Sequence, residues 1–138
     1  MLFTFFNSII RMEDRFFNMN EYCNCYNKNF SISKINVILS TLGFSERYIA
    51  FNYLSFIIIY MHRSKSDSSQ TYKQAIAELQ KKYGVSARTI TFGLSYLLSC
   101  CTNPELTSKT QYNISNKRIL NRIRLVKEFV EKKFFENI

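Results

Sequence analysis

Hydrophobic residues recur every three or four positions from residue 31 onward, which is the spacing of one face of an α-helix. The first such stripe ends at Gly43, and glycine readily adopts the positive φ found just after a helix C-terminus. A second helix is predicted to begin directly afterwards, at Ser45 and Glu46. The stripe of the first helix consists of Ile32, Ile35, Ile38, Leu39 and Leu42.

Between Tyr48 and Met61 almost every residue is apolar, so a helix there has hardly any polar face. A helix that is hydrophobic all round is a buried one, and this span is too short to cross a bilayer. We therefore expect it to form the centre of the core. His62 and Arg63 end this helix, and the lone histidine is expected to be a solvated residue rather than a ligand or a catalytic base.

Residues 70–101 are predicted to form two short helices joined by a tight turn. Gly84 can end the first helix, and the Ser86 hydroxyl can cap the second by accepting from the backbone N–H of Arg88 or Thr89. This pattern is typical of a helix-turn-helix, whose second helix reads base edges, although an ordinary helical hairpin has the same pattern. The predicted buried stripes are Tyr72, Ala75, Ile76, Leu79 and Tyr83 in the first helix and Ile90, Leu94, Leu97, Leu98 and Cys101 in the second.

The residues of the second helix that lie off the buried stripe are the candidates for base contacts. Arg88 is the only guanidinium among them, and arginine on guanine is the commonest specific contact to a base. The hydroxyl side chains can each bond a base edge singly, and Phe92 can contact a thymine methyl group, so the pattern favours A/T-rich sites. The predicted base-reading residues are Ser86, Arg88, Thr89, Thr91, Phe92, Ser95 and Tyr96.

A last long helix is predicted to follow its cap, Ser115, and it carries seven Lys or Arg residues against three Glu. Its basic face either contacts DNA phosphates or is simply solvated. Its predicted inner stripe consists of Ile119, Ile123, Val126, Val130 and Phe134. The predicted phosphate-contacting residues, in this helix and in the one before Gly84, are Lys73, Lys81, Lys82, Lys117, Arg118 and Arg122.

The composition favours an all-α fold, because the 138 residues include only 3 Gly and 1 Pro. We expect a compact bundle of about six helices that contains the helix-turn-helix, with residues 31–136 as one domain. Residues 1–30, rich in Phe and Asn, are expected to form a loosely structured N-terminal arm. The arm has neither the pattern of a signal peptide nor the length of a membrane span, so a cytoplasmic protein without a membrane segment is expected.

The formal net charge of +9 fits an anionic partner, and double-stranded DNA is the commonest one, although a solvated basic face or an anionic membrane surface gives the same charge. The cysteines occur as Cys23-Asn24-Cys25 and Cys100-Cys101, spacings closer than those of zinc ligands, so free thiols and no metal are expected. The sequence contains no recognisable arrangement of nucleophile, paired carboxylates or phosphate-binding glycine loop, so neither an enzyme nor a cofactor is expected.

Several of these residues resemble, in the same order, the DNA-binding effector domain of the sporulation initiation response regulators, the stage zero sporulation protein A family. The resemblance spans approximately residues 31–135. It implies a bundle of about six helices that binds DNA as tandem copies and normally follows a phosphorylatable receiver domain. The matching positions are Ile32-x-x-Ile35 through Leu42-Gly43-Phe44, Ala50-Phe51-x-Tyr53-Leu54, and Leu79-x-Lys81-Lys82-Tyr83 before Ser86-Ala87.

The chain departs from the family pattern in two ways. The thirty residues before the domain are too few for a receiver, so control by phosphorylation of this chain is not expected. Where the family presents arginines to DNA, this sequence has Thr89, Phe92 and Ser95, and Tyr96 stands at a family histidine position. These replacements leave open whether base reading is retained.

Two functions are therefore expected from the sequence. The first is a receiver-less, sequence-specific transcription regulator that binds DNA as a homodimer or as tandem copies. The second is a homologue that no longer reads bases and acts as an interaction module or antagonist by pairing with a full-length family member. The Gly84-Val85-Ser86 corner and the basic excess favour the first.

Overall fold

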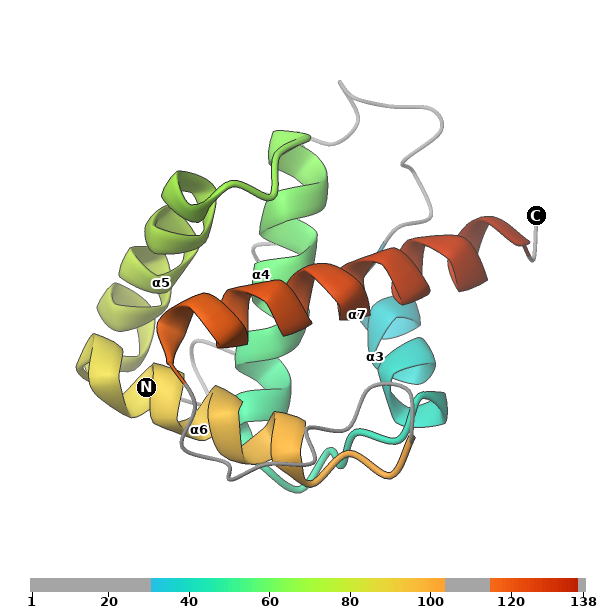
Figure 1. The fold of residues 1–138 in the computed structure, drawn as a ribbon, viewed down its shortest axis with the longest axis horizontal. Coiled ribbons are helices and arrows are strands. Elements are labelled where there is room, and N and C mark those ends of the chain that lie inside the picture. The colour runs from blue at the N-terminus through green and yellow to red at the C-terminus, as the bar shows by residue number, and fades with distance from the viewer. Residues whose placement is uncertain (1–30, 104–114, 137–138) are drawn as a thin grey trace.

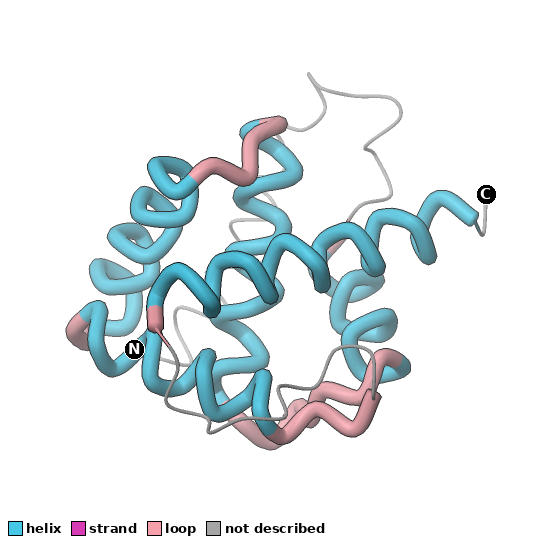
Figure 2. The backbone as a smooth tube through the Cα atoms, viewed as in Figure 1, coloured by secondary structure: helices cyan, strands magenta, loops and turns pink. Residues whose placement is uncertain are grey.

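Residues 31–103 and 115–136, the part described in the computed structural model, fold into five α-helices without a strand (Figures 1 and 2). The predicted all-α fold is therefore confirmed for this part, with five helices where about six were expected. The predicted arm, residues 1–30, lies outside the described residues. With the labels of Figure 1, the helices are α3 (Ile32–Thr41), α4 (Ile49–Ser64), α5 (Ser69–Tyr83), α6 (Ala87–Ser99) and α7 (Asn116–Glu136).

Helix α4 lies at the centre of the described part and contacts each of the other four helices (Figure 1). Leu54, Ile57 and Ile58 have no solvent-exposed surface, and most of the remaining side chains of α4 are buried as well. This arrangement confirms the prediction that the nearly all-apolar segment forms the core. No described helix is long and apolar enough to cross a membrane.

Helix α3 ends at Gly43 as predicted, in a hydrogen-bonded turn. The Gly43 N–H donates to the Ser40 carbonyl over 3.1 Å, and the Phe44 N–H donates to the Leu39 carbonyl over 3.1 Å. These two bonds close a helix when the residue after its C-cap has positive φ, and Gly43 has a φ of 105°. The Thr102 N–H also donates to the Gly43 carbonyl over 3.2 Å, so the segment after α6 is tied to the end of α3.

The predicted start of the second helix at Ser45 and Glu46 is wrong, because α4 begins at Ile49. Their side chains instead hold the connection between α3 and α4. The Ser40 hydroxyl donates to the Glu46 carboxylate over 2.8 Å, and the Arg47 N–H donates to the Ser45 hydroxyl over 3.3 Å. Phe44 is buried and Tyr48 packs against the core, so the connection is anchored at both of its ends.

Helix α7 crosses in front of α4 in Figure 1, with its N-terminal end near α6 and its C-terminal end near α3. Its first turn is capped as predicted, because the Arg118 N–H donates to the Ser115 hydroxyl over 3.3 Å. All five residues of its predicted inner stripe are buried, and Leu120 is buried beside them. This packing places the N-terminal end of α7 beside the α5–α6 pair.

Candidate nucleic-acid interface

Helices α5 and α6 are joined by three residues whose geometry follows the sequence prediction. Gly84 has a left-handed φ of 67°, and its N–H donates to the Gln80 carbonyl over 2.8 Å to end α5. The Ser86 hydroxyl accepts from the Thr89 N–H over 3.1 Å and so caps α6. Val85, between them, packs against the core. The corner therefore fixes α6 relative to α5 by backbone geometry, capping and burial together.

The predicted buried stripes of both helices are confirmed, with Tyr83 only partly buried at the end of α5. The predicted outer face of α6 is only partly confirmed. Arg88, Thr89, Phe92 and Tyr96 are exposed, whereas Thr91 is half-buried.

The prediction that Ser95 points outward is wrong, because only 2% of its surface is exposed. Helix α6 contacts α4, α5 and α7, so its buried arc is wider than that of a helix with a single neighbour. Ser95 falls within the widened arc. A residue in this position cannot reach a base edge, so Ser95 is removed from the candidate base-reading residues.

The hydroxyl groups at the start of α6 are engaged within the helix. The Ser86 and Thr89 hydroxyls lie 3.0 Å apart and share a hydrogen bond, while Ser86 also caps the helix. The Thr91 hydroxyl donates to the Arg88 carbonyl over 3.1 Å. These hydroxyl groups therefore already take part in hydrogen bonds within the helix. The Arg88 guanidinium is the strongest hydrogen-bond donor on the exposed face of this turn.

Aromatic side chains occupy the next part of the exposed face of α6. Phe92 is 53% exposed and Tyr96, one turn later, is 39% exposed. The rings of Tyr96 and Tyr48 meet edge to face, with centroids 5.4 Å apart. Hydrogen bonds of its hydroxyl with Cys100 and Tyr48 raise the pKa of Tyr96 to about 12, so it is uncharged at neutral pH. We call Phe92, Tyr96 and Tyr48 the aromatic patch.

The predicted phosphate-contacting residues fall into two groups. Lys73 and Lys117 line one pocket where α7 begins beside α5 and α6, and Arg118 is exposed in the same first turn of α7. Lys81 and Lys82 lie in the last turn of α5, where Lys81 is 4.0 Å from the Glu78 carboxylate. An exposed pair at this distance contributes little to stability, so Lys81 stays available to an anion.

Arg122, further along α7, is only half-buried and also belongs to the predicted phosphate set. Arg124, two residues further along α7, is half-buried and is held by two hydrogen bonds. The Arg124 Nε donates to the Asp67 carbonyl over 2.8 Å, and its Nη1 donates to the Asn121 amide oxygen over 2.9 Å. Not every cation of α7 is therefore free to face an anionic partner.

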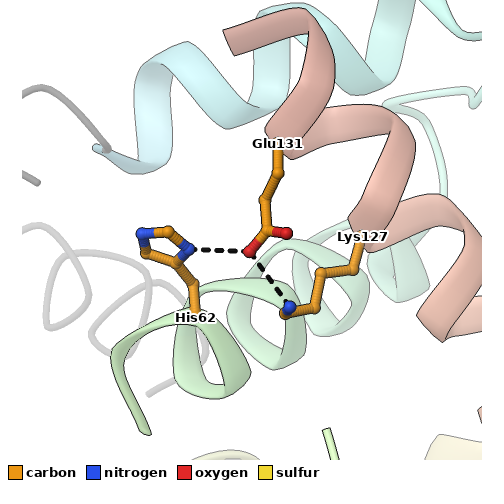
Figure 3. A network of polar contacts seen from close by, with 3 residues as sticks. All are labelled: His62, Lys127 and Glu131. Carbon is orange, nitrogen blue, oxygen red and sulfur yellow. Dashed lines mark hydrogen bonds and ion pairs between the residues drawn. The ribbon is translucent and has the colours of Figure 1, made fainter. Parts of the chain in front are cut away.

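A polar network between α4 and α7 was missed by the sequence reasoning (Figure 3). His62 Nδ1 and Glu131 Oε2 are 2.8 Å apart, and Lys127 Nζ lies 3.0 Å from the same Glu131 oxygen. His62 is therefore a partner of a carboxylate rather than a solvated residue. The i, i+4 spacing of Lys127 and Glu131 could have indicated their ion pair, but nothing in the sequence places His62 beside them.

Metal-binding side chains do not gather in the part of the chain that the structure covers, where no three His, Cys, Asp or Glu residues come together. Cys100 and Cys101 form no disulfide bond there, and Cys23 and Cys25 lie outside it. Comparisons with models of protein families, with curated proteins and with solved structures found no significant match to this chain. The resemblance to the sporulation family therefore stays a prediction from the sequence.

Proposed function

We propose that this chain is a DNA-binding transcription regulator in which α5 and α6 act as a helix-turn-helix. The observation that carries the proposal is the first turn of α6, where Arg88 is exposed next to the rigid, capped corner. Lys73 and Lys117 share a pocket with Ala87 and Thr91 of the same helix, so cations flank this turn. An exposed guanidinium with flanking lysines suits a helix that enters the major groove between two phosphate backbones.

In this role, different residues would contact the bases and the phosphates of the DNA. Arg88 would bond a guanine edge and Phe92 would contact thymine methyl groups, while the lysines of α5 and the first turns of α7 would neutralise phosphates. Few hydrogen-bonding side chains on α6 reach outward, so specificity would be modest and would favour A/T-rich sites. Two copies, as a homodimer or in tandem, would compensate by doubling the number of contacts.

The second candidate function is pairing with a full-length member of the sporulation family, and the aromatic patch favours it. An exposed phenylalanine beside a tyrosine is typical of a protein-binding hot spot and contributes little to binding a phosphate backbone. In this alternative, α6 no longer reads bases and the chain alters the assembly of its partner on DNA.

Selection from a randomised duplex pool at two salt concentrations tests the proposal. A regulator enriches related A/T-rich sequences at both concentrations, because base contacts persist when the electrostatic contribution is weakened. A chain that binds DNA by charge alone enriches no sequence and loses its affinity at the higher salt. The latter outcome, together with a stable complex with a full-length family member, would establish the second function instead.

A further inference from the structure

A pocket of about 590 Å³ lies where the first turns of α7 meet α5 and α6. Such a volume is within the range of about 300–1,000 Å³ that small-molecule sites occupy. The pocket joins three helices that are distant in sequence, and it includes residues of the first two turns of α6. The lining residues that can meet a ligand with their side chains include Lys73, Ile76, Thr91, Lys117, Leu120 and Arg124.

The lining has an apolar part and a positively charged part. Ile76 and Leu120 are buried apolar side chains, and Lys73, Lys117 and Arg124 supply three cations. No carboxylate belongs to the lining. A neutral apolar ligand would leave the charges of the two lysines without a partner, whereas a small inorganic anion would leave the apolar wall uncovered.

The two lysines are available for such a ligand. Neither Lys73 nor Lys117 forms an ion pair with a described residue, and both side chains are exposed. Arg124 is held in place by its bonds to Asp67 and Asn121, so it adds a fixed positive charge. The lysines can therefore close on an acidic group without breaking an existing contact.

Tyr72 also belongs to the lining of the pocket, and it is a mostly buried aromatic residue. It is 5% exposed, and its hydroxyl is buried without a hydrogen-bond partner among the described residues. Burial raises the pKa of Tyr72 to about 12, so the phenol keeps its proton at neutral pH. This hydroxyl has no solvent-accessible surface, so it is not one of the groups that bind a ligand in the pocket.

We propose that this pocket binds a small amphipathic anion, a ligand with an apolar body and one acidic headgroup. The body lies against Ile76 and Leu120, and the headgroup is bound by Lys73 and Lys117. The DNA backbone is also anionic, but a phosphodiester has no apolar body to fill the pocket. Binding does not depend on the proposed DNA function, although the ligand would touch α6 at Ala87 and Thr91.

The test titrates the full 138-residue chain, without DNA, with two dyes of nearly the same shape. One is 8-anilino-1-naphthalenesulfonate, which carries one acidic group, and the other is N-phenyl-1-naphthylamine, which carries none. We expect one saturable site that binds the sulfonate more tightly. The double variant Lys73→Gln/Lys117→Gln should weaken sulfonate binding about tenfold, since bonds to charged groups are being lost, and leave the uncharged dye unaffected.

Two further variants locate the site. Lys81→Gln/Lys82→Gln removes the same charge outside the pocket and should leave the binding of both dyes unchanged. Thr91→Phe fills the pocket and should weaken the binding of both dyes. This variant is used only if it retains the helical content and the cooperative unfolding of the wild type. The proposal is overturned if no saturable site exists, if both lysine pairs have equal effects, or if Thr91→Phe leaves binding intact because the dye lies on the aromatic patch.

Discussion

Two glycines of the described part have positive φ, and their surroundings give them different roles. Gly84 has a φ of 67°, and a Cβ atom added there would have no neighbour within 4 Å. Gly43 has a φ of 105°, and an added Cβ would lie 2.5 Å from Thr102 Oγ1 and 2.9 Å from the backbone nitrogen of Asn103. Gly84 is thus required for its backbone conformation alone, while Gly43 also permits the close approach of a second segment.

Replacing each glycine by alanine should separate these two roles. Gly84→Ala should lower the free energy of unfolding by about 1–2 kcal/mol, the cost of a left-handed conformation for a residue with a Cβ. Gly43→Ala should cost clearly more, because the backbone at Asn103 must move as well. Urea unfolding of both variants measures the difference. Equal losses would show that the contact between Gly43 and the segment after α6 contributes nothing.

Among the helices, α4 determines stability because the other four described helices all pack against it. Leu54→Ala or Phe51→Ala should lower the free energy of unfolding by about 2–5 kcal/mol, through lost burial and a residual cavity. Leu125→Ala on α7 is the matched control, since Leu125 is exposed, and it should cost less than about 1 kcal/mol. Losses as small as the control's at both α4 positions would refute the core assignment.

The network of His62, Glu131 and Lys127 holds α7 against the C-terminal end of α4 (Figure 3). Burial favours a raised pKa for the Glu131 carboxyl. Hydrogen bonds and charge interactions with His62 and Lys127 outweigh burial, so the pKa of Glu131 is lowered. The network therefore contributes its full stability above the unfolded-state pKa of about 4.3. That contribution is lost as the pH falls through the lower folded-state pKa.

Glu131→Gln should therefore destabilise the protein by about 1–3 kcal/mol at pH 7, the usual effect of losing hydrogen bonds to a charged group. The difference from the wild type should shrink as the pH falls below about 4, where the wild-type carboxyl also becomes protonated. Urea unfolding at pH 7 and pH 3 measures both effects. Glu128→Gln, at an exposed position of α7, is the control and should change little. A difference that stays constant with pH would exclude a role for the charge.

The sequence was sufficient to predict where the described helices lie, but not where α4 begins or which side chains lie between helices. Periodicity predicted the buried stripes and the Gly84 and Ser86 corner, because these depend on one helix at a time. The burial of Ser95 depends on how many helices pack against α6, which no local pattern shows. The contact between His62 and Glu131 joins residues that are 69 positions apart, so the histidine was predicted to be solvated.

At the scale of the whole molecule, the net charge of +9 fits binding to DNA of any sequence, and the number of cations that contact phosphates should determine that affinity. If Lys81, Lys82, Arg118 and Arg122 contact phosphates, each change to alanine should weaken binding to all duplexes alike. Each change should also lower the slope of log K against log salt concentration by about one unit. Fluorescence anisotropy over a series of salt concentrations measures the slope.

Lys34→Ala is the control for these measurements, because Lys34 is exposed on α3, which lies on the other side of α4 from α5 in Figure 1. It should leave the slope unchanged. Slopes that are unchanged in all four test variants would mean that their charges are only solvated.

The last prediction distinguishes a DNA-reading regulator from a chain that pairs with another protein, because two exposed residues of α6 serve the two functions differently. For a regulator, Arg88→Ala should weaken the free energy of binding to the best DNA site by about 1–3 kcal/mol, because a base contact is lost. Non-specific affinity for DNA should stay nearly intact, because the phosphate contacts remain. For an interaction module, Phe92→Ala should abolish pairing with a full-length homologue, because truncating an aromatic anchor removes the centre of the interface. Binding measurements on both variants, with a selected duplex and with the homologue, compare the two losses. We expect Arg88→Ala to weaken DNA binding more than Phe92→Ala weakens binding to the homologue. If the only large loss of affinity is that of Phe92→Ala for the homologue, the chain is an interaction module instead.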